Sequence, residues 1–328
     1  MINRQLKFFE AIREAIDICL ERDRNTYLMG LGVPDPIGVF GTTKGLQDKH
    51  GKKRVFDMPV AESAMSGVAL GSCLVGMRPI MTHMRLEFAM TAMDQICNQA
   101  AKWHYMFGGQ SKVPLTIRML VGRGWGQGPQ HSQSLHAWFA HIPGLKVVMP
   151  ATPADAKGLL KAAIRDDNPV VFIEGEMLYN NKGEVPEGEY LTPLGTADIK
   201  RAGTDVTIVS HGKTVAVALK AAEQLAAEGV NAEVIDLRTI RPLDTATILG
   251  SVSRTNRCVV VEEGWQFAGV GAQVVDLIQR EIFDALDAPV LRVTGADVPM
   301  PYNKHLEKAA KADPAKVIAA AKQVLYLP

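Results

Sequence analysis

The sequence has few cysteines and no long apolar run. The four cysteines are scattered, without paired spacing and without clustered histidines: Cys19, Cys73, Cys97 and Cys258. This scatter argues against a disulfide framework or a zinc site and is typical of a reducing compartment. No apolar stretch approaches the length of a membrane span. Residues 1–23 alternate apolar and charged side chains at helical spacing, which predicts an amphipathic helix and not a signal peptide. We therefore expect a cytoplasmic protein without a membrane partner.

The sequence also lacks an excess of charge of either sign. Lys and Arg number 36 and Asp and Glu 35, so the net charge is +1, and no basic block stands out. Nucleic acid is therefore not an expected partner, since its phosphates are bound by clustered basic side chains. The length of 328 residues predicts about two domains, each large enough for its own core.

Short apolar runs alternate with helical patterns in both halves of the chain. In the first half, strands are predicted at 25–32, 54–59, 78–84, 113–122, 145–150 and 169–176, and helices at 62–75, 89–106 and 153–166. In the second half, strands are predicted at 205–212, 231–238, 257–264 and 289–295, and helices at 213–228, 242–251, 270–285 and 314–325. Such alternation predicts an α/β fold class, with parallel sheets covered by helices on both faces.

Residues 178–200 interrupt this alternation. They are rich in Gly, Pro, Asn and charged side chains, a composition typical of a linker. We therefore expect one doubly wound domain over residues 1–178, a linker over 179–200 and a second doubly wound domain over 201–328.

Two glycine-rich stretches suggest nucleotide binding at first, but their details do not support it. The stretch "GVGAQV", 269–274, has only the first two glycines of a dinucleotide fingerprint. The stretch "GRGWGQGPQHSQ", 122–133, lacks the Gly-Lys-Ser/Thr ending of a phosphate loop. Its glycines instead indicate a mobile loop between a strand and a helix, where functional residues are common. His131, at the end of this loop, is either a catalytic residue or a structural hydrogen-bonding side chain.

Glu62 lies at the start of a run of small and apolar residues, "FDMPVAESAMSGVALG", 56–71. A carboxylate in the first turn of a helix is stabilised by the helix dipole by about 0.3–1 kcal/mol, so a capping role is one interpretation. The other is a catalytic acid in an apolar pocket. Position alone leaves both open.

Longer segments carry a resemblance to a known family: "RVFDMPVAESAMSG", "DQICNQAAKWHYM", "IDLRTIRPLD" and "LDAPVLRVTGADVPMPYN". Over nearly its whole length the chain resembles the beta subunit of the thiamine-diphosphate-dependent decarboxylating component of 2-oxoacid dehydrogenase complexes, of the pyruvate and acetoin type. The resemblance implies a pyrimidine-binding domain followed by a transketolase C-terminal domain. That order agrees with the break at 178–200.

The resemblance implies an activity with several alternatives. The main one is oxidative decarboxylation of a 2-oxoacid, above all pyruvate, with transfer of the acyl group to lipoamide. Alternatives within the same chemistry are an acetoin dehydrogenase and a stand-alone transketolase-like acyloin or two-carbon transferase subunit. A non-catalytic assembly subunit is an alternative of another class. Retention of the family residues Glu62, Phe88 and His131 argues against it.

The resemblance also implies partners. The family holds Mg²⁺ and the cofactor's diphosphate with a Gly-Asp-Gly motif followed by an Asn, and no Gly-Asp-Gly occurs in this sequence. We therefore expect an alpha subunit to supply both, in a heterotetramer of two alpha and two beta subunits. A lipoyl acyltransferase core is a further expected partner.

Individual positions match functional residues of the family. Glu62 matches the glutamate that exchanges a proton with the aminopyrimidine ring of thiamine diphosphate, a task suited to a carboxyl group in an apolar pocket. Phe88 matches the aromatic residue that packs on that ring, and Met84 matches a second pocket residue. His131 matches a histidine near the reacting end of the cofactor, which assists acyl transfer.

Four further positions match a structural monovalent cation site, K⁺ in some relatives: Leu115, Ala163, Asp166 and Asn168. Oxygen ligands suit a hard cation. Asp166 and Asn168 equally fit an ordinary helix end.

The chain departs from the family pattern close to the expected pocket. Arg85 replaces a small polar residue, and Leu86 and Glu87 replace an aromatic residue and an Asn. Leu31 and Gly32 stand where relatives carry acidic residues. The charged pair Arg85 and Glu87 predicts an altered choice of 2-oxoacid or acceptor.

Overall fold

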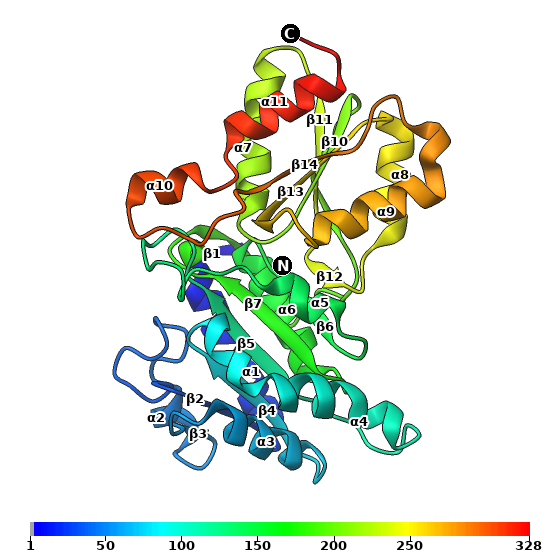
Figure 1. Cartoon of the computed structure of the whole chain (residues 1–328). Coiled ribbons are helices and arrows are strands. Elements are labelled where there is room, and N and C mark those ends of the chain that lie inside the picture. The colour runs from blue at the N-terminus through cyan, green and yellow to red at the C-terminus, as the bar shows by residue number, and fades with distance from the viewer. Residues whose placement is uncertain (1–2) are drawn as a thin grey trace. The chain divides into compact units, whose positions relative to one another are not determined.

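The computed structural model describes residues 3–328, which form two compact units (Figure 1). Unit 1 contains the chain up to Gly122 together with Trp138–Leu194, and unit 2 contains Arg123–Ala137 together with Gly195–Pro328. Residues 123–137, which the expected boundaries assign to the first domain, thus cluster with the C-terminal half. Residues 179–194 of the expected linker cluster with unit 1.

A parallel sheet forms the centre of unit 1. Its strands lie in the order β6-β7-β5-β4-β2-β3, and every neighbouring pair is parallel. Their bounds are β2 (Thr26–Gly30), β3 (Val55–Phe56), β4 (Arg78–His83), β5 (Thr116–Val121), β6 (Lys146–Val148) and β7 (Val170–Gly175). Every residue of β2 and β5 is buried, as expected for strands covered on both faces. The α/β prediction is confirmed, and each predicted strand of this half is present.

Helices surround this sheet: α1 (Phe8–Arg22), α2 (Leu46–His50), α3 (Glu62–Cys73), α4 (Ala101–Met106) and α6 (Pro153–Arg165). Helix α1 packs against α6, and apolar side chains of both join one core cluster. Thr152 caps α6 by accepting the Asp155 backbone N–H, and Pro153 occupies its first turn. Helix α5 (His136–His141) begins in the range of unit 2.

The structure corrects two helix predictions. Residues 3–7 form strand β1 (Asn3–Lys7), antiparallel to β8 (Lys182–Pro186), so α1 begins only at Phe8. The Glu10 carboxylate fixes that start by accepting the Lys7 backbone N–H at 2.8 Å. The helix predicted over 89–106 is divided into the 3₁₀ helix η1 (Leu86–Ala92), the π-helical η2 (Asp94–Ala100) and α4. A separate 3₁₀ turn, η3 (Glu176–Leu178), follows β7.

A second, mainly parallel sheet forms unit 2, in the order β14-β13-β10-β11-β9. Its strands are β9 (Asp198–Arg201), β10 (Val206–Ser210), β11 (Ala232–Asp236), β13 (Cys258–Trp265) and β14 (Leu291–Gly295). Only β9 is antiparallel to its neighbour. The other elements are β12 (Thr239–Arg241), α7 (Thr214–Ala227), α8 (Thr245–Thr255), α9 (Val270–Ile282), η4 (Phe283–Ala285), α10 (Lys304–Ala309) and α11 (Pro314–Val324). A separate apolar cluster, which includes Val259 and Val261 of β13, forms its core.

Among residues 3–328, no helix combines the length and the apolar character that crossing a bilayer would need.

Candidate active site

Glu62 is the first residue of α3, as the sequence predicts. The preceding residue, Ala61, offers no side-chain cap, so the carboxylate lies in a first turn whose N–H groups lack a side-chain acceptor from the cap position. Glu62 is half-buried, and within residues 3–328 its carboxylate makes no hydrogen bond or ion pair. A half-buried carboxylate without a structural partner is free to bind a ligand.

Met84 and Phe88 come from elements that pack against α3. Met84 directly follows β4, and Phe88 lies in η1; both side chains are half-buried. Helix α3 packs against both β4 and η1. The three residues predicted to surround the aminopyrimidine therefore belong to mutually packed elements of unit 1.

The backbone at Gly32 favours a glycine at this position. Gly32 adopts a positive φ of +70°, and a Cβ there would lie 3.1 Å from Asp35 Oδ2 and 3.9 Å from Met84 Sδ. Its backbone N–H donates to Asp57 Oδ1 at 3.1 Å. A larger residue at this position would be strained and crowded. Asp35 and Asp57 place carboxylates beside Gly32.

Arg85 and Glu87 are buried. The Arg85 guanidinium lies 3.2 Å from Glu176 Oε2, donates to the Met84 carbonyl at 2.6 Å and lies 5.1 Å from the ring centroid of Phe40. Burial raises the pKa of Glu176 to about 7, although the positive charge of Arg85 acts in the opposite direction. Arg85 therefore balances a buried carboxylate that is otherwise costly to ionise.

Replacing Arg85 by Thr should destabilise the chain more at high pH than at low pH. Because the pKa of Glu176 is raised from 4.5 to about 7, its favourable contribution is complete below pH 4.5 and is lost as the pH rises through about 7. Removing Arg85 takes away the charge that lowers the pKa of Glu176, so the loss of stability should continue to higher pH. At pH 8.5 the free energy of unfolding should fall by about 3–5 kcal/mol relative to the wild type. Urea unfolding at pH 6 and pH 8.5 measures it. The double variant Arg85→Thr, Glu176→Gln should recover part of the loss. An equal loss at both pH values would contradict the pairing.

His131 lies in the loop that clusters with unit 2, and its side chain is half-buried. Buried Arg123 holds the base of this loop: its Nε donates to the Ser132 carbonyl at 3.1 Å, its Nη1 donates to the Glu263 carbonyl, and its guanidinium lies 5.0 Å from the ring centroid of Trp265. The Lys213 ammonium donates to the Arg123 carbonyl at 2.6 Å. The loop predicted to be mobile is thus bonded to the body of unit 2.

Glu307, in α10, holds the glycine-rich part of the same loop. Its buried carboxylate accepts the backbone N–H groups of Gly124 at 2.6 Å and Gly126 at 3.1 Å. Gly128 has a positive φ of +75°, and a Cβ there would lie 2.3 Å from the Tyr302 ring. Sequence reasoning missed Glu307 and Tyr302 because nothing in the local pattern connects them to a loop some 180 residues earlier.

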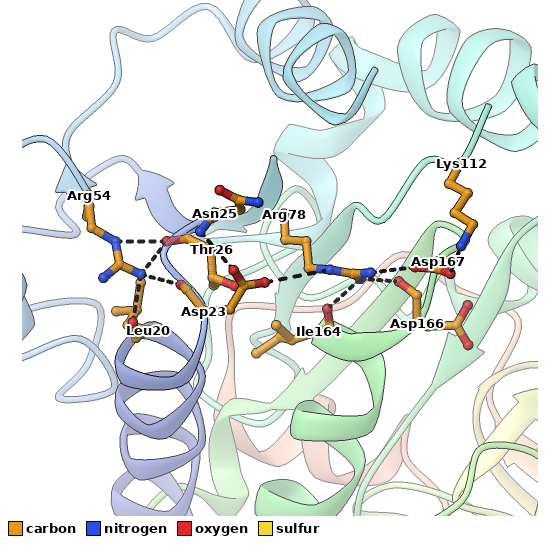
Figure 2. Close-up of polar contacts among 10 residues, drawn as sticks. All are labelled: Leu20, Asp23, Asn25, Thr26, Arg54, Arg78, Lys112, Ile164, Asp166 and Asp167. Atoms are coloured by element: carbon orange, nitrogen blue, oxygen red, sulfur yellow. Dashed lines mark hydrogen bonds and ion pairs between the residues drawn. The ribbon is translucent and has the colours of Figure 1, made fainter. Parts of the chain in front are cut away.

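Of the predicted cation-site residues, Ala163 lies in the last turn of α6, Asp166 caps that helix, and Leu115 directly precedes β5. Figure 2 shows Asp166 beside Arg78. Arg78 donates to the carbonyl oxygens of Ile164 at 3.3 Å and Asp166 at 3.0 Å. The Asp166 carboxylate pairs with Lys146 and accepts the Asn168 backbone N–H at 2.9 Å. Two positive side chains therefore already lie at this helix end.

The two remaining predicted ligands also have partners. The Ala163 carbonyl accepts the Asp166 N–H at 3.2 Å, and the Leu115 carbonyl accepts the Val170 N–H at 2.9 Å. A carbonyl oxygen has two lone pairs, so each keeps one acceptor position.

Comparisons with known proteins identify the domains and the family of this chain. Residues 4–182 match the family described as the transketolase pyrimidine binding domain, and residues 195–317 match the transketolase C-terminal domain. The chain is 48% identical over 323 residues to the mitochondrial pyruvate dehydrogenase E1 component subunit beta of Caenorhabditis elegans, with 97% of this chain and 92% of the relative covered. It is 47% identical over 322 residues to the corresponding subunit of Rickettsia felis, with 98% and 99% covered.

A solved structure described as a split-gene transketolase, an inactive beta4 tetramer, has a TM-score of 0.81 and 25% identity, and covers 98% of this chain and 99% of its own. The two domains, in this order, define a transketolase-type protein of the thiamine-dependent class. Within that class, the chain belongs to the family of pyruvate dehydrogenase E1 component beta subunits.

Proposed function

We propose that this chain acts with an alpha subunit to decarboxylate pyruvate oxidatively and to transfer the resulting acetyl group to lipoamide. The observation that carries the proposal is the 47–48% identity to pyruvate dehydrogenase beta subunits over nearly the full length. Arg85 and Glu87 are both buried, so they are not exposed to a substrate directly. Any effect of theirs on substrate choice would be indirect, through the position of the backbone at Met84, to whose carbonyl Arg85 donates.

The site residues fit thiamine diphosphate. When bound, the cofactor supplies the nucleophilic carbon that attacks the 2-oxo group. Glu62 would hold and exchange a proton at its carboxyl oxygen with the pyrimidine ring nitrogen, and its lack of a partner within residues 3–328 leaves that oxygen accessible. The half-buried ring of Phe88 would pack on the pyrimidine, and the half-buried Met84 would line the same pocket. His131 would donate hydrogen bonds near the reacting end.

The partner is proposed from what the sequence does not contain. No Gly-Asp-Gly occurs in the chain, so the alpha subunit would hold Mg²⁺ and the diphosphate. We propose a heterotetramer of two alpha and two beta subunits that delivers acetyl groups to a lipoyl acyltransferase core. The cytoplasm is the proposed compartment because all four cysteines are free, although several relatives are named mitochondrial.

A monovalent cation, K⁺ in the first instance, remains part of the proposal. The spare acceptor positions of the Leu115 and Ala163 carbonyls support it, and the charges of Arg78 and Lys146 oppose it. Thermal unfolding of the complex in KCl and in tetramethylammonium chloride of equal ionic strength tests it. A higher Tm in K⁺ is the expected result.

The proposed reaction is tested by assembling this chain with a Gly-Asp-Gly-containing alpha subunit from the same genome. Pyruvate should be the best of a panel of 2-oxoacids, and acetyl-dihydrolipoamide should accumulate. A complex that forms and binds cofactor but prefers a branched 2-oxoacid would contradict the choice of pyruvate and leave the subunit assignment intact.

Glu307→Ala should selectively slow acyl transfer. The change removes the acceptor for two N–H groups of the loop that carries His131, so that loop loses its alignment. Since small misplacements of positioned groups are costly, we expect about a 10-fold or larger fall in acetyl transfer to lipoamide. Decarboxylation measured with a dye acceptor should change much less.

Glu307→Gln keeps one acceptor oxygen and should lose less than Glu307→Ala. Glu281→Ala, at an exposed glutamate of α9, is the matched control and should leave both half-reactions unchanged. Equal losses in both half-reactions would indicate a general structural effect and contradict the positioning role.

A further inference from the structure

Three buried side chains gather inside unit 2 and take no part in the proposed reaction: His136, His211 and Glu262, which are 0%, 2% and 0% exposed. His136 begins α5, His211 directly follows β10, and Glu262 lies in β13. The two imidazole centroids are 4.9 Å apart with an interplanar angle of 70°. His136 Nε2 lies 3.9 Å from Glu262 Oε2.

The polar atoms of this cluster lack hydrogen-bond partners. Within residues 3–328, neither ring nitrogen of His136, neither of His211, nor Oε2 of Glu262 has a hydrogen-bond partner. A buried polar atom without a hydrogen-bond partner destabilises the folded chain, so five of them in one cluster indicate that the site holds a further group.

Glu262 is held so that only one of its oxygens faces the histidines. Its Oε1 accepts the Gly271 N–H at 3.0 Å and the Arg292 guanidinium at 2.7 Å. A Cβ at Gly269 or Gly271 would lie 2.7 or 2.6 Å from the same carboxylate. The glycines of "GVGAQV" therefore make room for the Glu262 carboxylate. This close approach, and not nucleotide binding, accounts for the two glycines that resemble a dinucleotide fingerprint. The second oxygen, Oε2, remains directed at His136.

We propose that His136, His211 and Glu262 bind a divalent transition-metal ion, Zn²⁺ in the first instance, and leave a fourth position for water. Two imidazoles and one carboxylate are a ligand set that zinc favours, and they come from three separate segments of unit 2. One ligand atom from each residue lies within 4.8 Å of the other two. Bonds of about 2.0–2.2 Å in a tetrahedral site would place them roughly 3.4 Å apart, so the side chains must close inward by about 1 Å.

The surrounding charges set the affinity. Arg292 shares the Glu262 carboxylate, and Lys213 lies 3.2 Å from Glu263 Oε2, with Arg123 bonded to the backbone of the same residue. Three positive side chains thus accompany two carboxylates near the site. A divalent ion bound there is partly opposed by charge, so we expect micromolar binding, weaker than in the closed sites of zinc fingers.

The test measures metal binding in the assembled, untagged complex. Inductively coupled plasma mass spectrometry after equilibration in zinc-buffered medium should find one zinc per chain, and Co²⁺ should give the visible absorption of a tetrahedral site. His136→Gln should abolish both. His141→Gln, at an exposed histidine on the same helix, is the matched control and should retain both.

His136→Cys separates ligation from folding. Since a thiolate also ligates zinc, this variant should still bind Co²⁺ and should add a sulfur-to-metal charge-transfer band in the near ultraviolet. If both complexes are folded and the wild type contains no more zinc per chain than His136→Gln, the proposal is overturned. A buried water would then be the occupant of the site. Should His136→Gln fail to assemble, absence of the tetrahedral Co²⁺ spectrum in the wild type would overturn it equally.

Discussion

The purified chain alone, supplied with thiamine diphosphate, Mg²⁺ and pyruvate, should release no CO₂ above the uncatalysed rate. The family resemblance assigns binding of the diphosphate to a Gly-Asp-Gly motif, which this sequence does not contain, so Glu62 would face a cofactor that is not anchored. Enzymes of ordinary efficiency accelerate reactions by about 10⁶-fold or more, so the expected loss is nearly the whole catalytic effect. Adding the alpha subunit should restore turnover at a one-to-one ratio of chains. Cofactor-dependent decarboxylation by this chain without any partner would contradict the two-subunit account.

Glu62→Gln should have the second largest effect. Glutamine is nearly isosteric and can still hydrogen-bond, but it cannot exchange a proton with the pyrimidine ring nitrogen. Loss of this acid–base function should lower kcat of the assembled complex by about 10²–10⁴. Cofactor affinity should fall much less. Thermal stability should stay nearly unchanged, because the carboxylate has no structural partner within residues 3–328.

Glu10→Gln is a matched control for that experiment. Glu10 lies in the first turn of α1 and does cap the helix, since its carboxylate accepts the Lys7 N–H at 2.8 Å. Its replacement should cost at most about 1 kcal/mol of stability and leave turnover intact. If Glu62→Gln behaved like Glu10→Gln, Glu62 would be a helix-start residue and not a catalytic one.

The regular part of the fold is predictable from local pattern. Runs such as "VTIVS" in β10 and "VVFIEG" in β7 are mostly apolar, because parallel strands are covered on both faces. Alternation of such runs with helical periodicity was therefore enough for the α/β class. The pairing of β1 with β8 was not predictable, since it joins segments about 180 residues apart. It takes up residues 3–7, so that α1 begins only at Phe8.

Burial of the site helix could be predicted only in part. Ala69 and Leu70 of α3 are buried, as their apolar character suggests, but Val68 is 57% exposed. Val60, just before the helix, is 78% exposed. An apolar pattern predicts that side chains are buried but does not identify the surface that buries them. In α3 some of the apolar side chains face away from the core of this chain. The role of Glu62 likewise came from family resemblance, because position alone fits a cap and a catalyst equally.

Hydrogen exchange at the thiazolium C2 of bound thiamine diphosphate tests the central claim most directly, since it reports proton transfer before any substrate reacts. In the assembled complex, quenched-flow exchange into D₂O followed by NMR should be fast with wild-type chain and with Glu10→Gln. It should be slower by about 10²–10⁴ with Glu62→Gln at saturating cofactor. Exchange at the wild-type rate in Glu62→Gln, with cofactor fully bound, would contradict the account.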